Sequence, residues 1–270
     1  MSVRPAAVAN LFYPGDVREL RRFIADTLSL ATKHLPANLP VPKAVIAPHA
    51  GYVYSGPTAA FAYAALQHAD INRVVMAGPA HRVPFYGMAL PADDAFATPL
   101  GRIQLDRKAM QQLQALPDVA VNSAAHAQEH SLEVQLPFLQ TMLGDFSLLP
   151  ICIGSVHPER VTTALEQLWG DAHTLFVISS DLSHYHTYAE ARVLDQHTIE
   201  MILQMDAPLN HEQACGATGI NALLPLARRF GLTPKLLDYR NSGDTAGDRD
   251  RVVGYASVAF FEPADEPERP

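Results

Sequence analysis

Lys43-Ala-Val-Ile-Ala-Pro-His-Ala-Gly-Tyr-Val-Tyr-Ser-Gly56 contains a short apolar strand that ends abruptly before a histidine. Residues 44–47 are all apolar, which predicts a buried strand. Proline has no backbone N–H to donate to a neighbouring strand, so Pro48 ends it, and Gly51 and Gly56 permit turns that other residues resist. The pattern therefore places His49 at the mouth of a sheet rather than inside its core.

Apolar strands and amphipathic helices alternate along the rest of the chain. Further strands are expected at 73–77, 146–153, 174–178, 235–239 and 252–261. Helices are expected at 16–34, 57–67, from about 106, at 130–143 with a kink at Pro137, and at 158–169, 189–205 and 215–230. This alternation predicts an α/β protein, with helices on both faces of a central, mostly parallel or mixed sheet in three layers. Because no composition shift or repeat divides the chain, we expect one domain over residues 1–270, with a frayed polar tail at 262–270.

The composition of the 270 residues excludes several classes of function. Hydrophobic residues make up 48% of the chain, which supports a substantial core, and the net charge of −8 with no Lys/Arg block disfavours nucleic-acid binding. No apolar run approaches the roughly 18 residues of a membrane span, and no secretory signal is evident. Only two cysteines, Cys152 and Cys215, are present, so we expect no disulfide framework and a cytoplasmic location.

Polar side chains with metal-binding chemistry follow the predicted strands. His49 and His81 each come directly after a strand, and Cys215 lies at the predicted start of a helix, where the helix dipole favours a thiolate. Two imidazoles and one thiolate suit zinc, copper or iron. An isolated histidine is more often structural, so the prediction rests on the shared position at the carboxyl edge of the sheet.

The loop after the strand at 174–178 offers an acid–base pair. His184 titrates near neutrality in its ordinary state, and Asp181 could orient its imidazole or remain a solvated loop acid. Ser183 beside His184 suggests a hydrolase, but the Gly-x-Ser-x-Gly turn of such enzymes is absent. We therefore assign the catalytic role to His184 and Asp181.

Other polar residues receive structural interpretations. Cys152 is expected to be a buried apolar residue, and Glu129-His130 is expected to be a helix-start pair. The loop Arg240–Arg249 either binds an anion or only turns between strands. No specific role is expected for His34, His68, His157, His173, His197 and His211.

Five motifs occur in order along the chain. They are Pro48–Gly56, Gly78–His81, Glu129–Phe138, Ser179–His184 and Asn241–Asp244. Together they resemble the Memo family, whose bacterial members are known as AmmeMemoRadiSam system protein B. The resemblance extends over nearly the whole chain.

This resemblance implies a single α/β domain similar to the class III extradiol dioxygenases. His49 and His81 match the two metal-binding histidines of the family, and Cys215 matches its cysteine ligand. His184 matches the acid–base histidine of the related dioxygenases, and Asp181 lies in the same motif. Those enzymes use a carboxylate where this chain has Cys215. The softer thiolate favours iron or copper, with zinc also suitable, so ring-cleaving activity does not follow.

The function that the resemblance implies is that of a cytoplasmic metal-dependent oxidoreductase without an assigned substrate. It would act with a radical-SAM protein and an AMMECR-like protein. The alternative is a non-enzymatic adaptor that uses the same pocket to bind a metal or a peptide, as eukaryotic relatives suggest. The ligand is accordingly a small molecule or a peptide, and Tyr52, Tyr54 or Tyr185 could shape the pocket.

Overall fold

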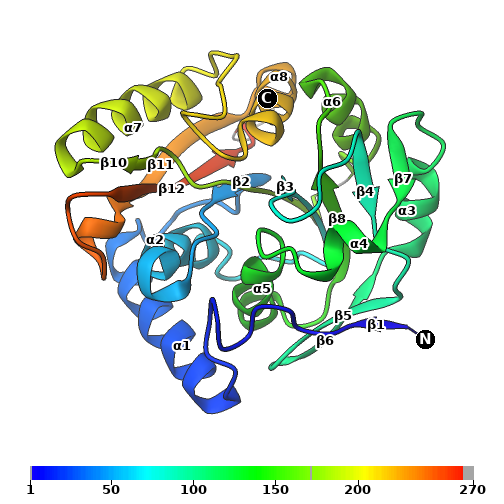
Figure 1. Cartoon of the computed structure of the whole chain (residues 1–270), viewed down its shortest axis with the longest axis horizontal. Coiled ribbons are helices and arrows are strands. Elements are labelled where there is room, and N and C mark those ends of the chain that lie inside the picture. Colours follow the sequence, from blue (N-terminus) through cyan, green and yellow to red (C-terminus); the bar gives the residue numbers. More distant parts are fainter. Residues whose placement is uncertain (1, 171, 264–270) are drawn as a thin grey trace, which may run out of the picture.

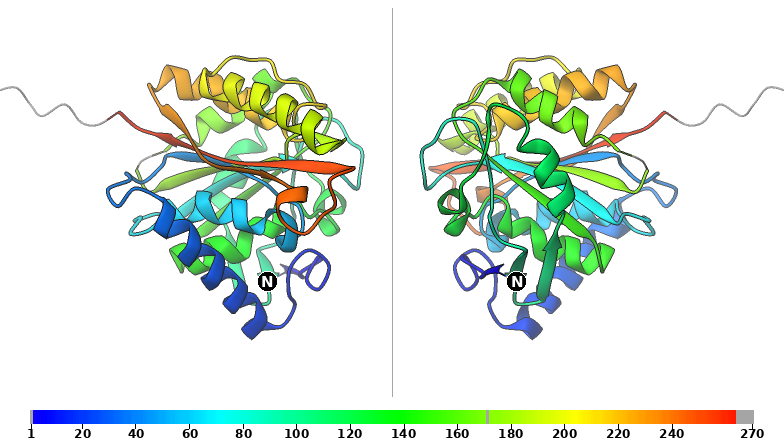
Figure 2. Two further views of the ribbon diagram at one scale, coloured as in Figure 1. Left: turned by 90° about the vertical axis from the view of Figure 1, so that its left-hand side faces the viewer. Right: turned by 90° about the vertical axis from the view of Figure 1, so that its right-hand side faces the viewer.

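A computed structural model of the protein describes residues 2–170 and 172–263 (Figure 1). These residues form a single α/β domain with a twelve-stranded mixed sheet between two layers of helices, which confirms the predicted fold class. The helices are α1 (Val17–His34), α2 (Tyr52–Ala64), α3 (Arg107–Leu113), α4 (Ser123–Ala127), α5 (Leu136–Leu143), α6 (Pro158–Gln167), α7 (Tyr188–Leu203) and α8 (Ala217–Arg229). Helices α1, α2 and α5 cover one face of the sheet, and α6, α7 and α8 cover the other (Figure 2).

The centre of the sheet is parallel and its margins are mixed. The strands are β1 (Val3–Arg4), β2 (Ala44–Ala47), β3 (Arg73–Pro79), β4 (Met88–Leu90), β5 (Ala95–Thr98), β6 (Gly101–Leu105), β7 (Val119–Val121), β8 (Ser147–Ile153), β9 (Thr174–Ser179), β10 (His184–His186), β11 (Thr233–Asn241) and β12 (Val252–Phe261). The main order is β1-β5-β6-β8-β3-β9-β2-β12-β10. Because β8, β3, β9 and β2 run parallel in register, their carboxyl ends meet at one edge.

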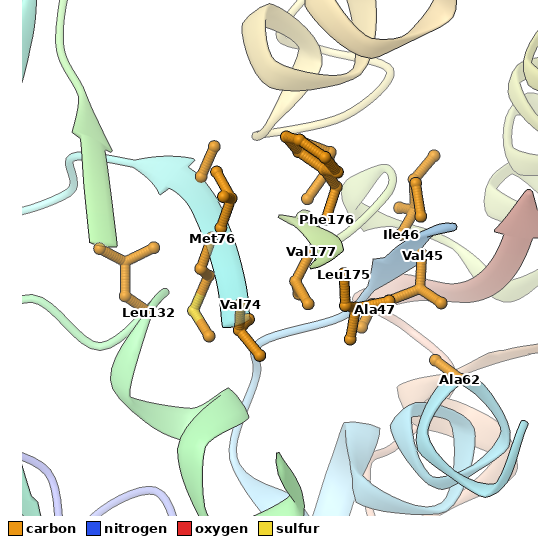
Figure 3. Packing of buried hydrophobic residues seen from close by; sticks show 14 of the residues in the cluster. Val45, Ile46, Ala47, Ala62, Val74, Met76, Leu132, Leu175, Phe176 and Val177 are labelled. Carbon is orange, nitrogen blue, oxygen red and sulfur yellow. The ribbon is translucent and has the colours of Figure 1, made fainter. Parts of the chain in front are cut away.

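Side chains of the central strands form the core of the domain. Val45 and Val177 point toward the face covered by α2, whereas Ile46 and Phe176 point to the opposite face (Figure 3). All four are fully buried. Both faces of these strands are covered by helices, which explains why their sequences are continuously apolar rather than alternating.

Pro57 and Pro137 lie at different places within their helices from those expected. Helix α2 begins at Tyr52 instead of Pro57, because the carbonyl of Gly51 already accepts hydrogen bonds from the backbone N–H groups of Tyr54 and Ser55. Pro137 does not kink a helix that starts at 130. It lies in the first turn of α5, where its missing N–H costs nothing, and a short 3₁₀ turn at 133–135 precedes it.

The remaining boundaries agree closely with expectation. Asp16 caps α1 by accepting from the N–H groups of Arg18 and Glu19. The sequence does not predict four short elements, β1, β7, α4 and β10. Of these, β10 pairs with β12 and carries His184 at its first position. Most of the predicted frayed tail, residues 264–270, lies outside the described residues. Within the described parts of the chain, no helix combines the length with the apolar character needed to traverse a lipid bilayer.

Candidate metal centre

His49 follows β2, and the hydrogen bonds of Ser179 fix its imidazole in one tautomer. The Ser179 hydroxyl donates its only proton to the carbonyl of Ser131, at 2.6 Å, and accepts from Nε2 of Gln135, at 2.8 Å. His49 Nδ1 lies 2.8 Å from the same oxygen, so it must be the protonated, donating nitrogen. Burial, followed by the neighbouring His81 and His130, lowers the pKa of His49 well below its usual value. His49 is therefore neutral and presents a bare Nε2.

His81 follows β3 and is oriented by a buried carboxylate. Glu129 accepts from the His81 backbone N–H at 2.6 Å and from its ring Nδ1 at 2.9 Å. The same carboxylate accepts from the backbone N–H groups of His130 and Ser131, at 3.0 and 2.9 Å. Because Nδ1 donates to Glu129, the Nε2 of His81 carries the lone pair that a metal ion can use.

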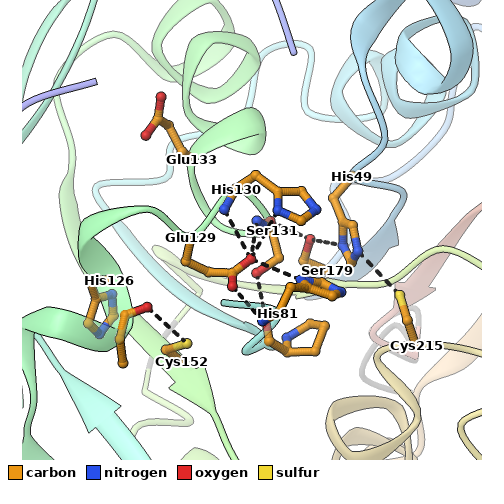
Figure 4. Close-up of polar contacts among 12 residues, drawn as sticks. His49, His81, His126, Glu129, His130, Ser131, Glu133, Cys152, Ser179 and Cys215 are labelled. Atoms are coloured by element: carbon orange, nitrogen blue, oxygen red, sulfur yellow. Dashed lines mark hydrogen bonds and ion pairs between the residues drawn. The ribbon is translucent and has the colours of Figure 1, made fainter. Parts of the chain in front are cut away.

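His130 joins these two histidines, as Figure 4 shows. One ligand nitrogen from each of His49, His81 and His130 lies within 4.8 Å of the other two. The Phe12 ring packs against the His130 ring at a tilt of 31°, with 4.4 Å between ring centroids. The buried Nδ1 of His130 lies 3.3 Å from Glu129 Oε1 but forms no hydrogen bond, and burial lowers the pKa of this imidazole to about 4. A neutral ring with an unsatisfied nitrogen fits a metal ligand.

Sequence reasoning gave His130 only a helix-start role. The Glu129-His130 pair was visible as part of a motif, but spacing alone does not reveal which buried loop folds back beside β3. The signal that could have identified His130 is its position next to Glu129, since a carboxylate that orients one imidazole commonly belongs to a metal centre.

Cys215, two residues before α8, lies on another side of His49. Its Sγ is 3.2 Å from His49 Nε2 and accepts a hydrogen bond from the Asp181 backbone N–H at 3.3 Å. It is not part of the group of three described histidines whose ligand atoms lie within 4.8 Å of one another. Burial and then the charge of Asp181 raise the pKa of the thiol to about 12, which opposes the thiolate that its place before a helix favours. A bound cation would reverse this balance.

Asp181 and His184 lie close to the centre but do not hydrogen-bond to each other among the described contacts. Asp181 Oδ1 accepts from the His49 backbone N–H at 2.7 Å, and burial raises the pKa of this carboxyl to about 7. The His184 ring bonds to the backbone of Leu182, and burial lowers its pKa. Asp181 therefore holds the chain at His49, and its predicted role of orienting His184 stays a prediction.

The donor set fits a transition metal. Two imidazoles have their Nδ1–H committed to neighbours, a third has an orphaned buried nitrogen, and a thiol lies beside the bare nitrogen of His49. For bond lengths near 2.0 and 2.3 Å, nitrogen and sulfur ligands of one tetrahedral ion lie about 3.5 Å apart, close to the separation of Cys215 and His49. Cys152, by contrast, is a fully buried core residue, as predicted.

Comparison with known proteins gives a consistent result. The family profile described as "Memo-like protein" matches residues 4–259. A MEMO1 family protein from Methanosarcina barkeri is 38% identical over 275 residues, covering 95% of this chain and 99% of the relative. A MEMO1 family protein from Aquifex aeolicus is 35% identical over 273 residues, covering 97% of this chain and all of the relative. The chain therefore belongs to the Memo family.

Proposed function

We propose that this chain is a metal-dependent enzyme with redox activity. His49, His81 and Cys215 would hold the ion, and His130 would supply a fourth donor. The observation that carries the proposal is the convergence of three neutral or oriented imidazoles within 4.8 Å at the carboxyl edge of the sheet. Neutral imidazole is the form that binds metal ions, and this edge is where α/β proteins place their ligands.

Iron or copper is the proposed metal, and zinc suits the same donors. Mixed imidazole and thiolate ligands select these ions over magnesium or calcium, which prefer oxygen. When bound, an iron or copper ion supplies one-electron chemistry and polarises a coordinated substrate atom. The chain's own contribution is to fix two nitrogen lone pairs, that of His49 through Ser179 and that of His81 through Glu129.

His184 is the proposed proton-transfer residue. Burial keeps its pKa below the usual value, so the imidazole is neutral and can accept a proton near neutral pH. Asp181 would assist by keeping His49 in place, and an interaction with His184 would require a rearrangement on substrate binding. We further propose that the protein works in the cytoplasm with a radical-SAM protein and an AMMECR-like protein, as its family resemblance suggests.

Metal content tests the centre itself. Protein purified without oxygen should contain about one equivalent of metal, and His49→Ala should lose most of it. His197→Ala, which removes an exposed histidine from α7, is the matched control and should retain the full amount. Equal metal in all three proteins would overturn the proposal.

The spectrum of the cobalt(II)-loaded protein distinguishes the proposed roles of Cys215 and His130 as metal ligands. Cys215→Ser should remove the near-ultraviolet thiolate-to-cobalt charge-transfer band, while His130→Ala should retain the band with weakened binding. A band unaffected by Cys215→Ser would exclude the thiolate from the centre.

His184→Ala separates an enzyme from a binding protein. In an enzyme, the substitution should abolish substrate consumption while leaving metal content unchanged. In an adaptor that only binds a ligand through the same pocket, it would change affinity alone, and no substrate would be consumed by the unmodified protein either.

A further inference from the structure

A groove of about 320 Å³ opens beside the candidate metal centre. Two residues of the proposed donor set, His81 and Cys215, are part of its lining. The other lining residues come from the end of β3 and the loop after it, from the end of β8 and from the segment before α8, and they include Val83, Phe85, Gly154 and His211. This is the size range of pockets that hold small molecules, roughly 300–1,000 Å³.

The walls of the groove are held by backbone hydrogen bonds between the loop at 80–87 and the end of β8. Ala80 N donates to Ile153 O at 2.9 Å, Ser155 N to Phe85 O at 2.8 Å, and Gly87 N to Ser155 O at 3.0 Å. Gly154 N also donates to Gly87 O, at 2.9 Å. The groove is thus built into the sheet edge rather than formed by an unattached loop.

Phe85 lies directly against the backbone of Gly154. A Cβ at Gly154 would stand 2.3 Å from the Phe85 carbonyl oxygen and 2.8 Å from two of its ring carbons. Only glycine permits so close an approach. The ring therefore forms a fixed apolar wall of the groove that His81 and Cys215 also line.

Charge is absent from this lining. No Lys, Arg, Asp or Glu is among the described residues that form the groove. His211 has both ring nitrogens occupied within its own segment, since Nδ1 lies 3.2 Å from Cys215 O and Nε2 lies 3.3 Å from Thr218 Oγ1. It therefore offers ring carbons, not free donors, to a molecule in the groove. Arg82, whose charge acts on His130, is not among the lining residues, so a phosphate or carboxylate in the groove would lose water without gaining a cationic partner from its lining.

We propose that this groove receives the uncharged, mainly apolar body of a small-molecule ligand whose single donor atom reaches the metal between His81 and Cys215. The inference rests on the proposed function, because the donor atom needs the ion. It goes further in specifying the chemical class of the ligand: apolar along its length and polar at one end.

Three imidazole probes test this class on the cobalt(II)-loaded protein. The probes are imidazole, 4-phenylimidazole with an apolar arm, and imidazole-4-acetate with an anionic arm, each titrated through the visible spectrum of cobalt. For each probe we take the association constant with the cobalt(II)-loaded protein relative to that with aqueous cobalt(II). On this corrected scale we expect 4-phenylimidazole to bind roughly tenfold or more tightly than imidazole. Imidazole-4-acetate should bind no more tightly than imidazole on the same scale.

Substitutions in the groove provide the matched comparison. Phe85→Ala should reduce the phenyl advantage at least about threefold, because the ring contact is lost. Tyr86→Ala changes the next residue, which is 92% exposed and does not line the groove, and should leave the advantage intact. Val83→Lys offers a second variant that preserves the Phe85 contact with Gly154, and it should raise the affinity for imidazole-4-acetate.

The outcomes separate this inference from the proposed function. Failure of the unmodified protein to bind cobalt, or equal binding by His49→Ala, would overturn both. Cobalt binding with no phenyl advantage, or an advantage insensitive to Phe85→Ala, would overturn the groove assignment alone. Tighter binding of an apolar histidine tripeptide amide than of 4-phenylimidazole would assign the groove to a peptide and likewise contradict the proposal.

Discussion

The carboxylate of Glu129 positions two of the three candidate imidazoles. It is 1% exposed and accepts four hydrogen bonds, two of them from His81 and one each from the backbones of His130 and Ser131. Burial alone, the largest single influence, would raise the pKa of this carboxyl. The hydrogen bonds from His81 and Ser131 outweigh it and lower the pKa to about 2.

Glu129→Gln should weaken metal binding while leaving the fold intact. An amide of the same shape can accept from the ring of His81 but cannot strengthen its basicity as a carboxylate does. We expect a loss of about 10–100-fold in metal affinity, measured by competition with a chelator. Glu159→Gln, at an exposed position on α6, is the control and should bind metal normally. An unchanged affinity in Glu129→Gln would show that His81 is not oriented through this contact.

The low pKa of Glu129 also predicts an acid-sensitive contribution to stability. Because the folded pKa, about 2, lies below the ordinary value of 4.5, the contribution is fully present above 4.5 and is lost as the pH falls toward 2. In urea unfolding of the metal-free protein, the difference in free energy of unfolding between wild type and Glu129→Gln should therefore be constant near neutral pH. The difference should narrow below pH 4.5. A difference independent of pH down to 3 would contradict the expectation.

At the scale of elements, the N-terminal segment fastens the loop that carries Glu129 and His130. Arg4, on β1, donates to the carbonyls of His126 and Glu129 and forms an ion pair of 2.6 Å with Glu133. Glu133 also accepts from the hydroxyl of Tyr13 at 2.6 Å. Arg4 is 4% exposed and Glu133 is fully buried, so each charge depends on the other for compensation.

Glu133→Gln should therefore destabilise the protein strongly. Removing one partner leaves the Arg4 cation buried without its counter-charge, a change that costs about 3–5 kcal/mol. The free energy of unfolding in urea measures it. Glu166→Gln breaks the exposed pair between Glu166 and Arg229 and should cost no more than about 1 kcal/mol. A similar loss of unfolding free energy in both variants would mean that burial does not make the Arg4–Glu133 pair more important for stability than an exposed pair.

The loop with His184 depends on a close contact between α7 and β12. Asp195 is fully buried and accepts from the Ser183 backbone N–H at 3.0 Å and from the Tyr239 hydroxyl at 2.9 Å. A Cβ at Gly254 would stand 2.1 Å from Asp195 Oδ2. Only glycine at position 254 lets β12 lie this close to the Asp195 carboxylate.

Gly254→Ala should displace Asp195 and, through Ser183, the loop that carries His184. We expect a loss of about 1–3 kcal/mol in the free energy of unfolding, together with a shifted His184 resonance in NMR spectra. Gly144→Ala is a control for loss of glycine freedom alone: its φ is 70°, yet no atom lies within 4 Å of the added Cβ. A His184 resonance shifted equally by both changes would refute the steric explanation.

For the whole molecule, metal binding and folding should be thermodynamically linked. The donors come from separate parts of the chain, so the unfolded protein has no comparable site. At a free metal concentration 100 times the Kd, the added stability is about 2.7 kcal/mol. This corresponds to a rise of about 5 °C in Tm for a protein of 270 residues. His49→Ala should show no rise and His197→Ala the full rise. An equal Tm with and without metal would exclude binding at a native-state site.

The sequence predicts the strands better than the starts of helices or the full site. Strands β2 and β12 were located to the residue, because continuous apolar runs flanked by proline or charge leave few alternatives. The sequence pattern places the start of α2 too late, because the preference of Pro57 for a first turn hides the helix start at Tyr52, which Gly51 caps. His49 and His81 could be placed at the sheet edge from local pattern. The approach of His130 depends on tertiary packing against Phe12, which no spacing rule encodes.

Strand order has a consequence for biosynthesis. His49 lies at the end of β2, whose neighbours in the sheet are β9 and β12. During translation the three histidines emerge early, but β2 gains no partner strand until residue 179, and its second only when residues 252–261 have left the ribosome. Until β12 has folded, β2 is therefore an edge strand of the sheet, with backbone groups on one side left unpaired. We expect the position of His49 to be fixed fully only once β12 has paired with β2.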